Sequence, residues 1–155
     1  MLTISIPGRG ELTLEHLLLD YNGTIAADGA LAEGVAERLE ALSQLLAIHV
    51  VTADTHGTAA GACAGLPVEV LTYPTDGVGA IKGEVAKRLG EGVVCVGNGF
   101  NDLLMAEACA LSVCVIGREG CCGALLGKSD VVVTSIADGL DLLLKPDRLR
   151  ATLRT

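Results

Sequence analysis

Hydrophobic residues in this chain fall into two alternating patterns. Short apolar runs end at Asp20, Thr52 and Gly97, and glycine or polar residues follow each of them closely. Between these runs lie longer stretches, such as 31–46, in which apolar residues recur at steps of three and four, the spacing of one helix face. Strands that are apolar on both faces and alternate with helices are typical of a parallel sheet covered on both sides. We therefore predict an α/β fold with a doubly wound parallel sheet.

The same patterns predict the order of the elements and one domain over residues 1–155. The first residues alternate between apolar and polar around a glycine turn, which indicates a β-hairpin, placed on the sheet edge, over residues 1–15. The core is expected over 16–145, and a basic tail over 146–155. The predicted strands are 17–19, 47–51, 93–96, 111–116 and 130–133. The predicted helices are 31–46, 77–89 (capped by Asp76 and ended by Gly90), 101–110, 122–126 and one that starts near Ser135.

Composition and charge exclude several classes of protein. The chain has 155 residues, of which 50% are hydrophobic and 2% aromatic, and its net charge is -8. A nucleic-acid partner is not expected, because it requires clustered Lys and Arg or stacking aromatic side chains. No apolar run approaches the roughly 20 residues that cross a bilayer, and the first ten residues lack the pattern of a signal peptide. We expect a protein of the cytoplasm without a membrane partner.

The six cysteines include no CxxC pair and have no His at zinc-like spacing. Three of them lie within apolar runs, where a reduced thiol packs as a small hydrophobic group. We therefore expect free thiols and no disulfide framework. No role is assigned to Cys121 and Cys122.

The residues that carry chemistry follow the apolar runs. In an open parallel sheet, ligands bind beyond the carboxyl ends of the strands. Two carboxylates, a hydroxyl, an ammonium and two glycine-containing turns are expected there, and such turns can direct backbone N–H groups at an anion. This combination indicates a phosphate and a hard metal ion such as Mg²⁺, which prefers oxygen ligands. The residues concerned are Asp20, residues 22–24, Thr52, Lys82, residues 97–99, Asn101 and Asp102.

At these positions the chain resembles the haloacid dehalogenase (HAD) superfamily. Residues 20–24, Asp-Tyr-Asn-Gly-Thr, are similar to its DxDGT motif, with Thr52 as the second motif and Lys82 as the third. Residues 96–102, Val-Gly-Asn-Gly-Phe-Asn-Asp, are similar to the fourth motif in the form VGDGxND. Within the superfamily, the chain most resembles the phosphorylation domain of P-type ATPases, as found in small stand-alone soluble phosphatases.

The resemblance implies a Mg²⁺-dependent phosphohydrolase with a Rossmann-like core. Asp20 would be the nucleophile that forms an aspartyl-phosphate, Thr52 would hydrogen-bond the phosphoryl oxygens, and Lys82 would neutralise their charge. Backbone N–H groups near Tyr21 would complete the phosphate cradle, and Asn101 would orient its neighbours. The full expected set is Asp20, Asn22, Thr52 and Lys82 for catalysis; Tyr21, Asn22, Gly23, Thr52, Ala53, Lys82 and Asn101 for the substrate; and Asp20, Asn22, Asn98 and Asp102 for the metal.

Two residues depart from the family's pattern. Asn22 stands where the family's phosphatases have an acid–base Asp, and losing such help costs about 10²–10⁴-fold in rate. We therefore expect a slow enzyme that favours good leaving groups, namely acyl, aryl or nucleotide phosphates. Asn98 stands where the family has a metal-binding Asp, so Mg²⁺ is expected to bind more weakly.

Spacing along the chain leaves no room for a cap domain. One helix fits between Thr24 and Thr52, and little more fits between Thr52 and Lys82. The resemblance is thus to a capless member, with a phosphorylated small molecule as substrate and an open site unless a second copy of the chain covers it. The alternative, suggested by Asn22 and Asn98, is a non-catalytic or regulatory phosphate-binding protein on the same fold.

Overall fold

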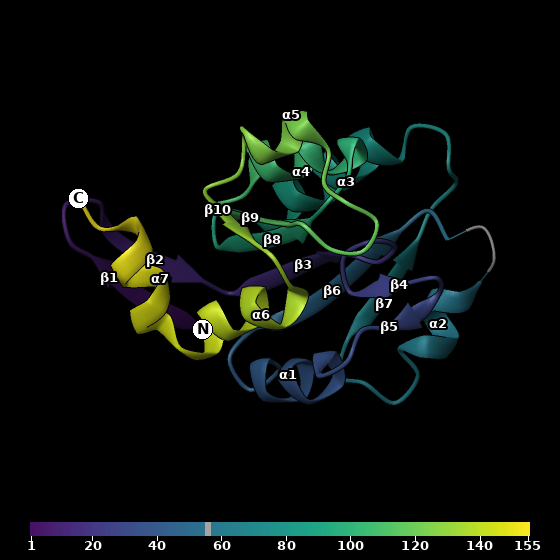
Figure 1. The fold of residues 1–155 in the computed structure, drawn as a ribbon, viewed down its shortest axis with the longest axis horizontal. Helices are drawn as coiled ribbons and strands as arrows, with labels where there is room; N and C mark the ends of the chain where they lie inside the picture. Colours follow the sequence, from purple (N-terminus) through teal and green to yellow (C-terminus); the bar gives the residue numbers. More distant parts are fainter. Residues whose placement is uncertain (55–56) are drawn as a thin grey trace.

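The computed structural model describes residues 1–54 and 57–155. Its centre is a six-stranded parallel sheet whose spatial order is β10-β9-β8-β3-β6-β7 (Figure 1). The strands are β3 (His16–Asp20), β6 (Ala47–Thr52), β7 (Glu69–Thr72), β8 (Val93–Gly97), β9 (Leu111–Val115) and β10 (Val131–Val133). The prediction of a parallel α/β sheet is confirmed.

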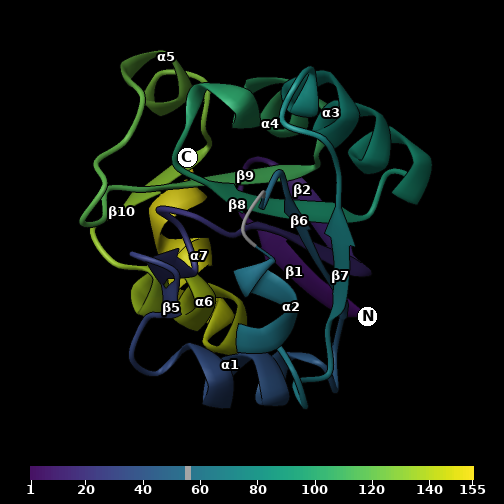
Figure 2. The ribbon, with the colours of Figure 1, turned by 90° about the vertical axis from the view of Figure 1, so that its right-hand side faces the viewer.

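Helices cover both faces of this sheet, as a doubly wound fold requires. On one face lie α3 (Val78–Leu89), α4 (Leu103–Ala108) and α5 (Gly123–Leu126); on the other lie α1 (Val35–Leu42), α2 (Thr58–Ala62) and α6 (Ile136–Leu144) (Figures 1 and 2). A short 3-10 helix, η1 (Phe100–Asp102), precedes α4. Among the described residues, no helix combines the length and the apolar character needed to cross a membrane.

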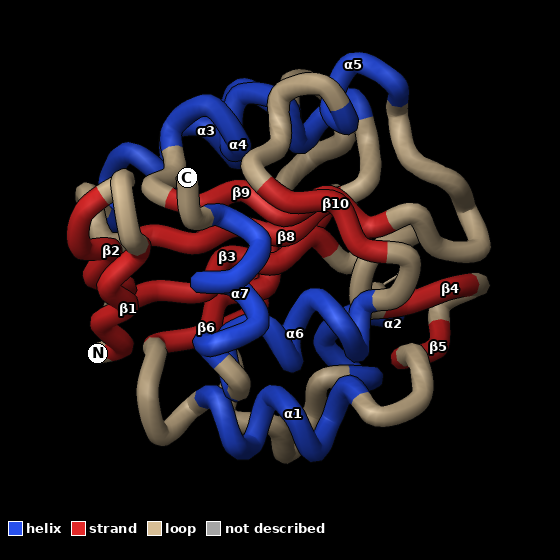
Figure 3. Tube along the Cα trace, turned by 60° about the vertical axis from the view of Figure 1, so that its left-hand side comes forward, coloured by secondary structure: helices blue, strands red, loops and turns tan. Residues whose placement is uncertain are grey.

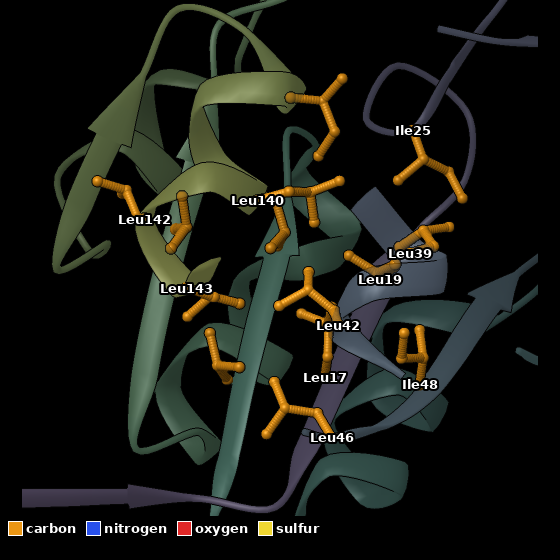
Figure 4. Close-up of a cluster of buried hydrophobic side chains, with 14 of the residues drawn as sticks. Leu17, Leu19, Ile25, Leu39, Leu42, Leu46, Ile48, Leu140, Leu142 and Leu143 are labelled. Atoms are coloured by element: carbon orange, nitrogen blue, oxygen red, sulfur yellow. The ribbon is translucent and has the colours of Figure 1, made fainter. Parts of the chain in front are cut away.

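The central strand β3 shows why its run is apolar throughout. Leu17 and Leu19 belong to the core on the α1 and α6 side, whereas Leu18 belongs to the core on the α3 and α4 side, and all three are fully buried. Side chains of a strand alternate between faces, so a strand covered on both sides must be apolar at every position. Figure 4 shows Leu17 and Leu19 among leucines from α1 and α6, such as Leu42 and Leu140.

The N-terminal hairpin forms, but it does not extend the main sheet. β1 (Leu2–Ile6) and β2 (Gly10–Leu14) pair antiparallel as a separate two-stranded sheet. α7 (Pro146–Leu153) packs against β1 (Figure 3). Our placement of the hairpin on the sheet edge is therefore wrong, because the buried side chains of Ile4 and Ile6 face α7 residues rather than a sheet neighbour. The segment expected to be a basic tail is this helix, and its Leu149 and Leu153 are buried.

Several short elements were not predicted. A small hairpin of β4 (Ala26–Ala27) and β5 (Ala30–Leu31) follows β3, and it delays the start of the next helix to Val35. Helix α2 and edge strand β7 were also missed, since β7 is half exposed and has no long apolar run. Helix α3 begins after Gly77, not Asp76, but it ends at Gly90 as predicted. Helix α6 begins next to Ser135 as expected, and the Ser135 hydroxyl caps it by accepting from the Asp138 N–H.

The cysteines differ in part from expectation. Four are free thiols, namely Cys63, Cys95, Cys109 and Cys122. Cys114 and Cys121 form a disulfide, so the expectation of reduced thiols throughout is wrong for this pair. The turn that follows β9 brings Cys121 back against the strand residue seven positions earlier, a proximity that sequence spacing alone does not indicate.

The order of the strands places a crevice beside β3. The chain passes from β3 through α1 to β6 on one face, and later from β7 through α3 to β8 on the opposite face. Strands β6 and β8 are therefore the two neighbours of β3, reached from opposite sides of the sheet. Ligands of open α/β sheets bind at such a reversal, beyond the carboxyl ends of the strands. Asp20, the last residue of β3, lies at this point.

Candidate active site at the carboxyl end of β3

A buried ion-pair cluster lies at the end of β3. The ammonium of Lys82, on α3, donates to Oδ1 of Asp20 at 2.6 Å and to Oδ1 of Asp102 at 2.7 Å. It also lies 3.3 Å from Oδ1 of Asn101. The relative exposures of Lys82, Asp20 and Asp102 are 1%, 6% and 0%. Three motif residues far apart in the sequence thus meet in one place.

The charges of this cluster do not balance. Two carboxylates face one ammonium, and the cluster is largely out of water, where an uncompensated charge is costly. Burial raises the pKa of Asp20 to about 6, and the nearby Asp102 carboxylate acts in the same direction, although Lys82 opposes both. Burial alone lowers the pKa of Lys82, but Asp20 and Asp102 outweigh it and the pKa is raised. A further cation near Asp20 would therefore be favourable.

Asp102 holds the loop that follows β8. Its Oδ2 accepts from the N–H groups of Asn98 and Gly99, at 3.0 and 2.9 Å, while Oδ1 accepts from Lys82. Gly97 permits this arrangement, because a Cβ there would lie 2.6 Å from the Asp102 carboxyl group. Both oxygens of Asp102 are engaged within the protein, so the residue fixes the geometry of the turn.

Asn98 and Thr24 connect this loop to the nucleophile candidate. The Thr24 hydroxyl lies 3.0 Å from Oδ2 of Asp20 and 3.1 Å from Oδ1 of Asn98. The Asn98 amide group donates to the carbonyl of Gly120 at 3.1 Å, which fixes its orientation. Gly23, with φ of 80°, makes room for it, since a Cβ there would lie 2.4 Å from Asn98 Nδ2. Asp20 and Asn98 therefore present oxygens to the same small region.

A cavity of about 400 Å³ opens over these groups. Its walls are Asp20, Asn22, Thr52, Ala53, Lys82, Asn98, Gly99, Phe100 and Asn101. Most residues that the sequence singled out are thus brought together. Tyr21 is fully buried with its hydroxyl on the Gly29 carbonyl at 2.9 Å, so its side chain serves the fold, and Asp102 lies behind the cavity wall.

The oxygens around the cavity fit a hard divalent cation. Among the described residues, no three His, Cys, Asp or Glu side chains are grouped as metal ligands. Mg²⁺ does not require such a group, since it binds through one or two carboxylates, further oxygens and the substrate phosphate. Asp20 supplies a carboxylate, Asn98 an amide oxygen fixed by its hydrogen bonds, and Asn22 lies at the same wall.

Two features of the site were not assigned from the sequence. Thr24 belongs to the first motif, but its link between Asp20 and Asn98 depends on the turn that Gly23 makes. The loop that follows β9 also supports Asn98, because the Cys122 N–H donates to the Asn98 carbonyl at 2.7 Å. That contact joins residues 24 positions apart and leaves no pattern in the sequence.

Comparison with known structures identifies the fold. A putative HAD family hydrolase from Streptomyces avermitilis superimposes with a TM-score of 0.69 over 86% of this chain and 87% of its own, at 22% identity. The 3-deoxy-D-manno-octulosonate 8-phosphate phosphatase of Moraxella catarrhalis, in a complex with magnesium, phosphate and its sugar, gives 0.70 over 91% and 94%, at 18% identity. The cobalt-bound phosphatase of this kind from Haemophilus influenzae gives 0.72 over 92% and 94%, at 12% identity.

Comparison of sequences points to an archaeal family. No model of a known protein family matches the chain. The uncharacterized protein MJ0073 of Methanocaldococcus jannaschii is 47% identical over 62 residues, which are 40% of this chain and 67% of that protein. MJ0072 of the same organism is 54% identical over 39 residues, 25% of this chain and 89% of that protein. The chain thus has the fold of the HAD superfamily and belongs to the family of MJ0073.

Proposed function

We propose that this protein is a divalent-metal-dependent phosphohydrolase that acts through an aspartyl-phosphate at Asp20. The observation that carries the proposal is the buried cluster in which Lys82 bridges Asp20 and Asp102 at 2.6 and 2.7 Å. It lies where an α/β sheet binds ligands, beneath a cavity large enough for a phosphoryl group. The fold neighbours include two sugar-phosphate phosphatases, which agrees with this assignment.

The side chains divide the reaction between them. An oxygen of Asp20 attacks phosphorus, and the bond from phosphorus to the leaving-group oxygen breaks with its electron pair on that oxygen. Lys82 and Thr52 stabilise the charge on the transferring oxygens, while Asp102 holds Lys82 and the loop after β8 in position. Water then attacks the phosphorus of the aspartyl-phosphate, which restores the carboxylate and releases inorganic phosphate.

Mg²⁺ is the proposed cofactor, held by Asp20, Asn98 and the main-chain carbonyl of Asn22. When bound, it reduces the repulsion between the carboxylate nucleophile and the phosphate. The fold neighbours described with cobalt and with magnesium support a divalent metal. We assign Asp102 to positioning, because its two oxygens already accept from Lys82, Asn98 and Gly99.

Asn22 limits the rate in this proposal. It lies in the cavity wall two residues after Asp20, and an amide cannot give a proton to the leaving group or take one from water. Leaving groups that need no proton, such as acyl, aryl or nucleotide phosphates, are therefore the proposed substrate class. Motif residues 96–102 underlie the further assignment to the soluble relatives of the P-type ATPase phosphorylation domain.

Hydrolysis of acetyl phosphate and p-nitrophenyl phosphate, with Mg²⁺ or with excess EDTA, tests the proposal. We expect turnover that requires Mg²⁺ and disappears in Asp20→Asn. If neither compound is turned over, and inorganic phosphate binds in a Mg²⁺-dependent way, the protein is instead the non-catalytic phosphate binder that Asn22 and Asn98 suggested. Sedimentation of the same sample would show whether a second copy of the chain associates with the first, as covering of the site would require.

A further inference from the structure

A second cavity adjoins the proposed active site. It has a volume of about 630 Å³ and is lined by residues at the start of α3 and in the η1–α4 segment. Figure 1 shows α3 and α4 on one face of the sheet. Three residues, Ala53, Phe100 and Asn101, line both this cavity and the one that holds Asp20. A ligand that places a phosphoryl group beside Asp20 can therefore extend into the second cavity without leaving the protein surface.

The second cavity is apolar where it meets the first. Phe100, the single phenylalanine of the chain, is 72% exposed, and Leu104 on the next turn is 49% exposed. Val78, the first residue of α3, and Leu103 add further apolar wall. Exposed apolar side chains of this size that border a binding site usually mark a ligand or partner contact. Burying them against an apolar group would be favourable.

Among the described wall residues of this cavity, the charged one already has a partner. Glu107 lies at its α4 side, where its carboxylate is 3.5 Å from the ammonium of Lys128. Small residues, among them Gly77, Gly79 and Ala80, line the opposite wall, and a Cβ on Gly79 would lie 3.3 Å from the Asn101 backbone. The cavity therefore favours a neutral, flat or slender apolar group rather than a sugar or a second phosphate.

A third cavity, of about 590 Å³, offers a contrast. It lies between the β4–β5 hairpin and the ends of β9 and β10, and its charged wall residues are Glu33 and Arg118. Within the described residues it has no wall residue in common with the cavity over Asp20. Shared walls, not volume, single out the cavity at Phe100 as the one that a substrate of Asp20 would enter.

We infer that the cavity at Phe100 binds the leaving group of the substrate and that this group is apolar, an aryl or hydrophobic acyl moiety. Phe100 would lie against it beside the reacting phosphate, and Leu104 would close its outer side. The inference rests on the proposed function for the position of the phosphate. It narrows the substrates from any good leaving group to aryl and hydrophobic acyl phosphates.

Binding of two phosphonates tests the inference without any need for turnover. In calorimetric titrations with Mg²⁺, 1-naphthylphosphonate is expected to bind at least about tenfold more tightly than methylphosphonate, since apolar contacts of this size give such ratios. Phe100→Ala and Leu104→Ala should each reduce that ratio severalfold, and Phe100→Leu should retain most of it. Val132→Ala, which removes an exposed apolar side chain on β10 outside both cavities, should leave the ratio unchanged.

Steady-state kinetics provide a second test of the preference for an apolar leaving group. The ratio of kcat/KM for 1-naphthyl phosphate to that for acetyl phosphate should fall about tenfold in Phe100→Ala. Equal affinities for the two phosphonates would overturn the inference even if both esters are hydrolysed. Conversely, the protein could hydrolyse neither substrate and still bind 1-naphthylphosphonate more tightly than methylphosphonate. That result would overturn the proposed function but support the apolar subsite at Phe100. If Phe100→Ala instead turns an oligomer into a monomer and leaves the ratio unchanged, the patch is an interface between copies and the inference is wrong.

Discussion

Two charged clusters in this molecule carry an excess of opposite charge. In the first, one ammonium, on Lys82, lies between the carboxylates of Asp20 and Asp102, and all three groups are buried. In the second, one carboxylate, on Asp141, lies among three cations at 2.8 to 3.6 Å, namely Arg38, Lys145 and Arg148. The first cluster is negative and out of water, whereas the second is positive and partly solvated.

The pKa values of the two central carboxyl groups move in opposite directions. Burial and the neighbouring carboxylate raise the pKa of Asp20 to about 6. Hydrogen bonds from Arg38 and then Lys145 lower the pKa of Asp141. The second cluster ties α6 to α1 and α7 and is complete as it stands, because water solvates its excess charge. The first lacks a positive charge, and this imbalance supports the proposal that the site receives a cation.

The largest expected effect comes from removing one carboxylate of each cluster. Asp20→Asn should lower kcat for acetyl phosphate by about 10⁶-fold, the scale seen when an enzyme loses its nucleophile. Asp141→Asn, the matched change in the surface cluster, should leave kcat unchanged. Steady-state phosphate release measures both variants. A similar loss in the two variants would show that the clusters differ in position but not in function.

A carboxyl group added beside the first cluster should accelerate the reaction, because it can donate a proton to the leaving group. Asn22→Asp places a proton donor in the cavity wall, so hydrolysis of alkyl phosphates should rise by about 10²–10⁴-fold. The gain on acetyl phosphate should be smaller, because its leaving group needs no proton. Rates on a matched pair of esters check this, and an equal gain on both would contradict the acid–base explanation.

Removing the cation of the first cluster should destabilise the fold. Lys82→Met leaves two buried carboxylates without their partner, and breaking a buried pair in this way costs about 3–5 kcal/mol. Urea unfolding at neutral pH measures the change, and Lys145→Met in the surface cluster serves as the control. A loss no larger than that of the control would mean that the buried carboxylates are not both charged.

A smaller effect is expected on metal affinity. Asn98→Asp introduces the negative charge that the HAD motif has at this position and this chain lacks. The change should tighten Mg²⁺ binding on the order of tenfold. The melting temperature as a function of Mg²⁺ concentration reports the affinity, because a ligand of the native state raises it. A midpoint that does not move would place the metal away from Asn98.

The smallest effect concerns the surface cluster and pH. Because the pKa of Asp141 is lowered in the folded state, its contribution to stability is present above the unfolded value, about 3.9, and is lost as pH falls through the folded value. Asp141→Asn should therefore lower the melting temperature by a few degrees at pH 6 to 8 and by progressively less as the pH falls below about 3.9. A difference that persists in acid would show that packing, not charge, holds α1, α6 and α7 together.

The central strands of the sheet could be predicted from the sequence. Burial on both faces gives each of them a continuous apolar run. Strands β3, β6, β8 and β9 were predicted because both of their faces are covered and most of their positions are apolar. The edge strand β7 and the small β4–β5 hairpin are partly exposed, so their residues carry no such constraint. The hairpin at the N-terminus was found, but its partner was not, since the helix that it packs on lies at the other end of the chain.

For the site, residue types were predictable and contacts were not. Asp20, Lys82 and Asn98 stand in motifs of fixed order, so their meeting could be expected. Asp102 was expected to bind the metal, and we propose a positioning role instead, because the turn at Gly97 brings its carboxylate oxygens against the N–H groups of Asn98 and Gly99. The contacts of Thr24 with Asp20 and Asn98, and the position of Phe100 between two cavities, depend on how the segments after β3 and β8 fold against each other.

Trapping the covalent intermediate tests the central claim most directly. The protein is mixed with acetyl phosphate and Mg²⁺, quenched in acid and digested, and the peptide containing Asp20 is examined by mass spectrometry. We predict a phosphate on Asp20 that requires Mg²⁺, is absent in Asp20→Asn and persists in Asp141→Asn. Mg²⁺-dependent turnover with no phosphate on Asp20, or a phosphate on any other residue, would contradict the account.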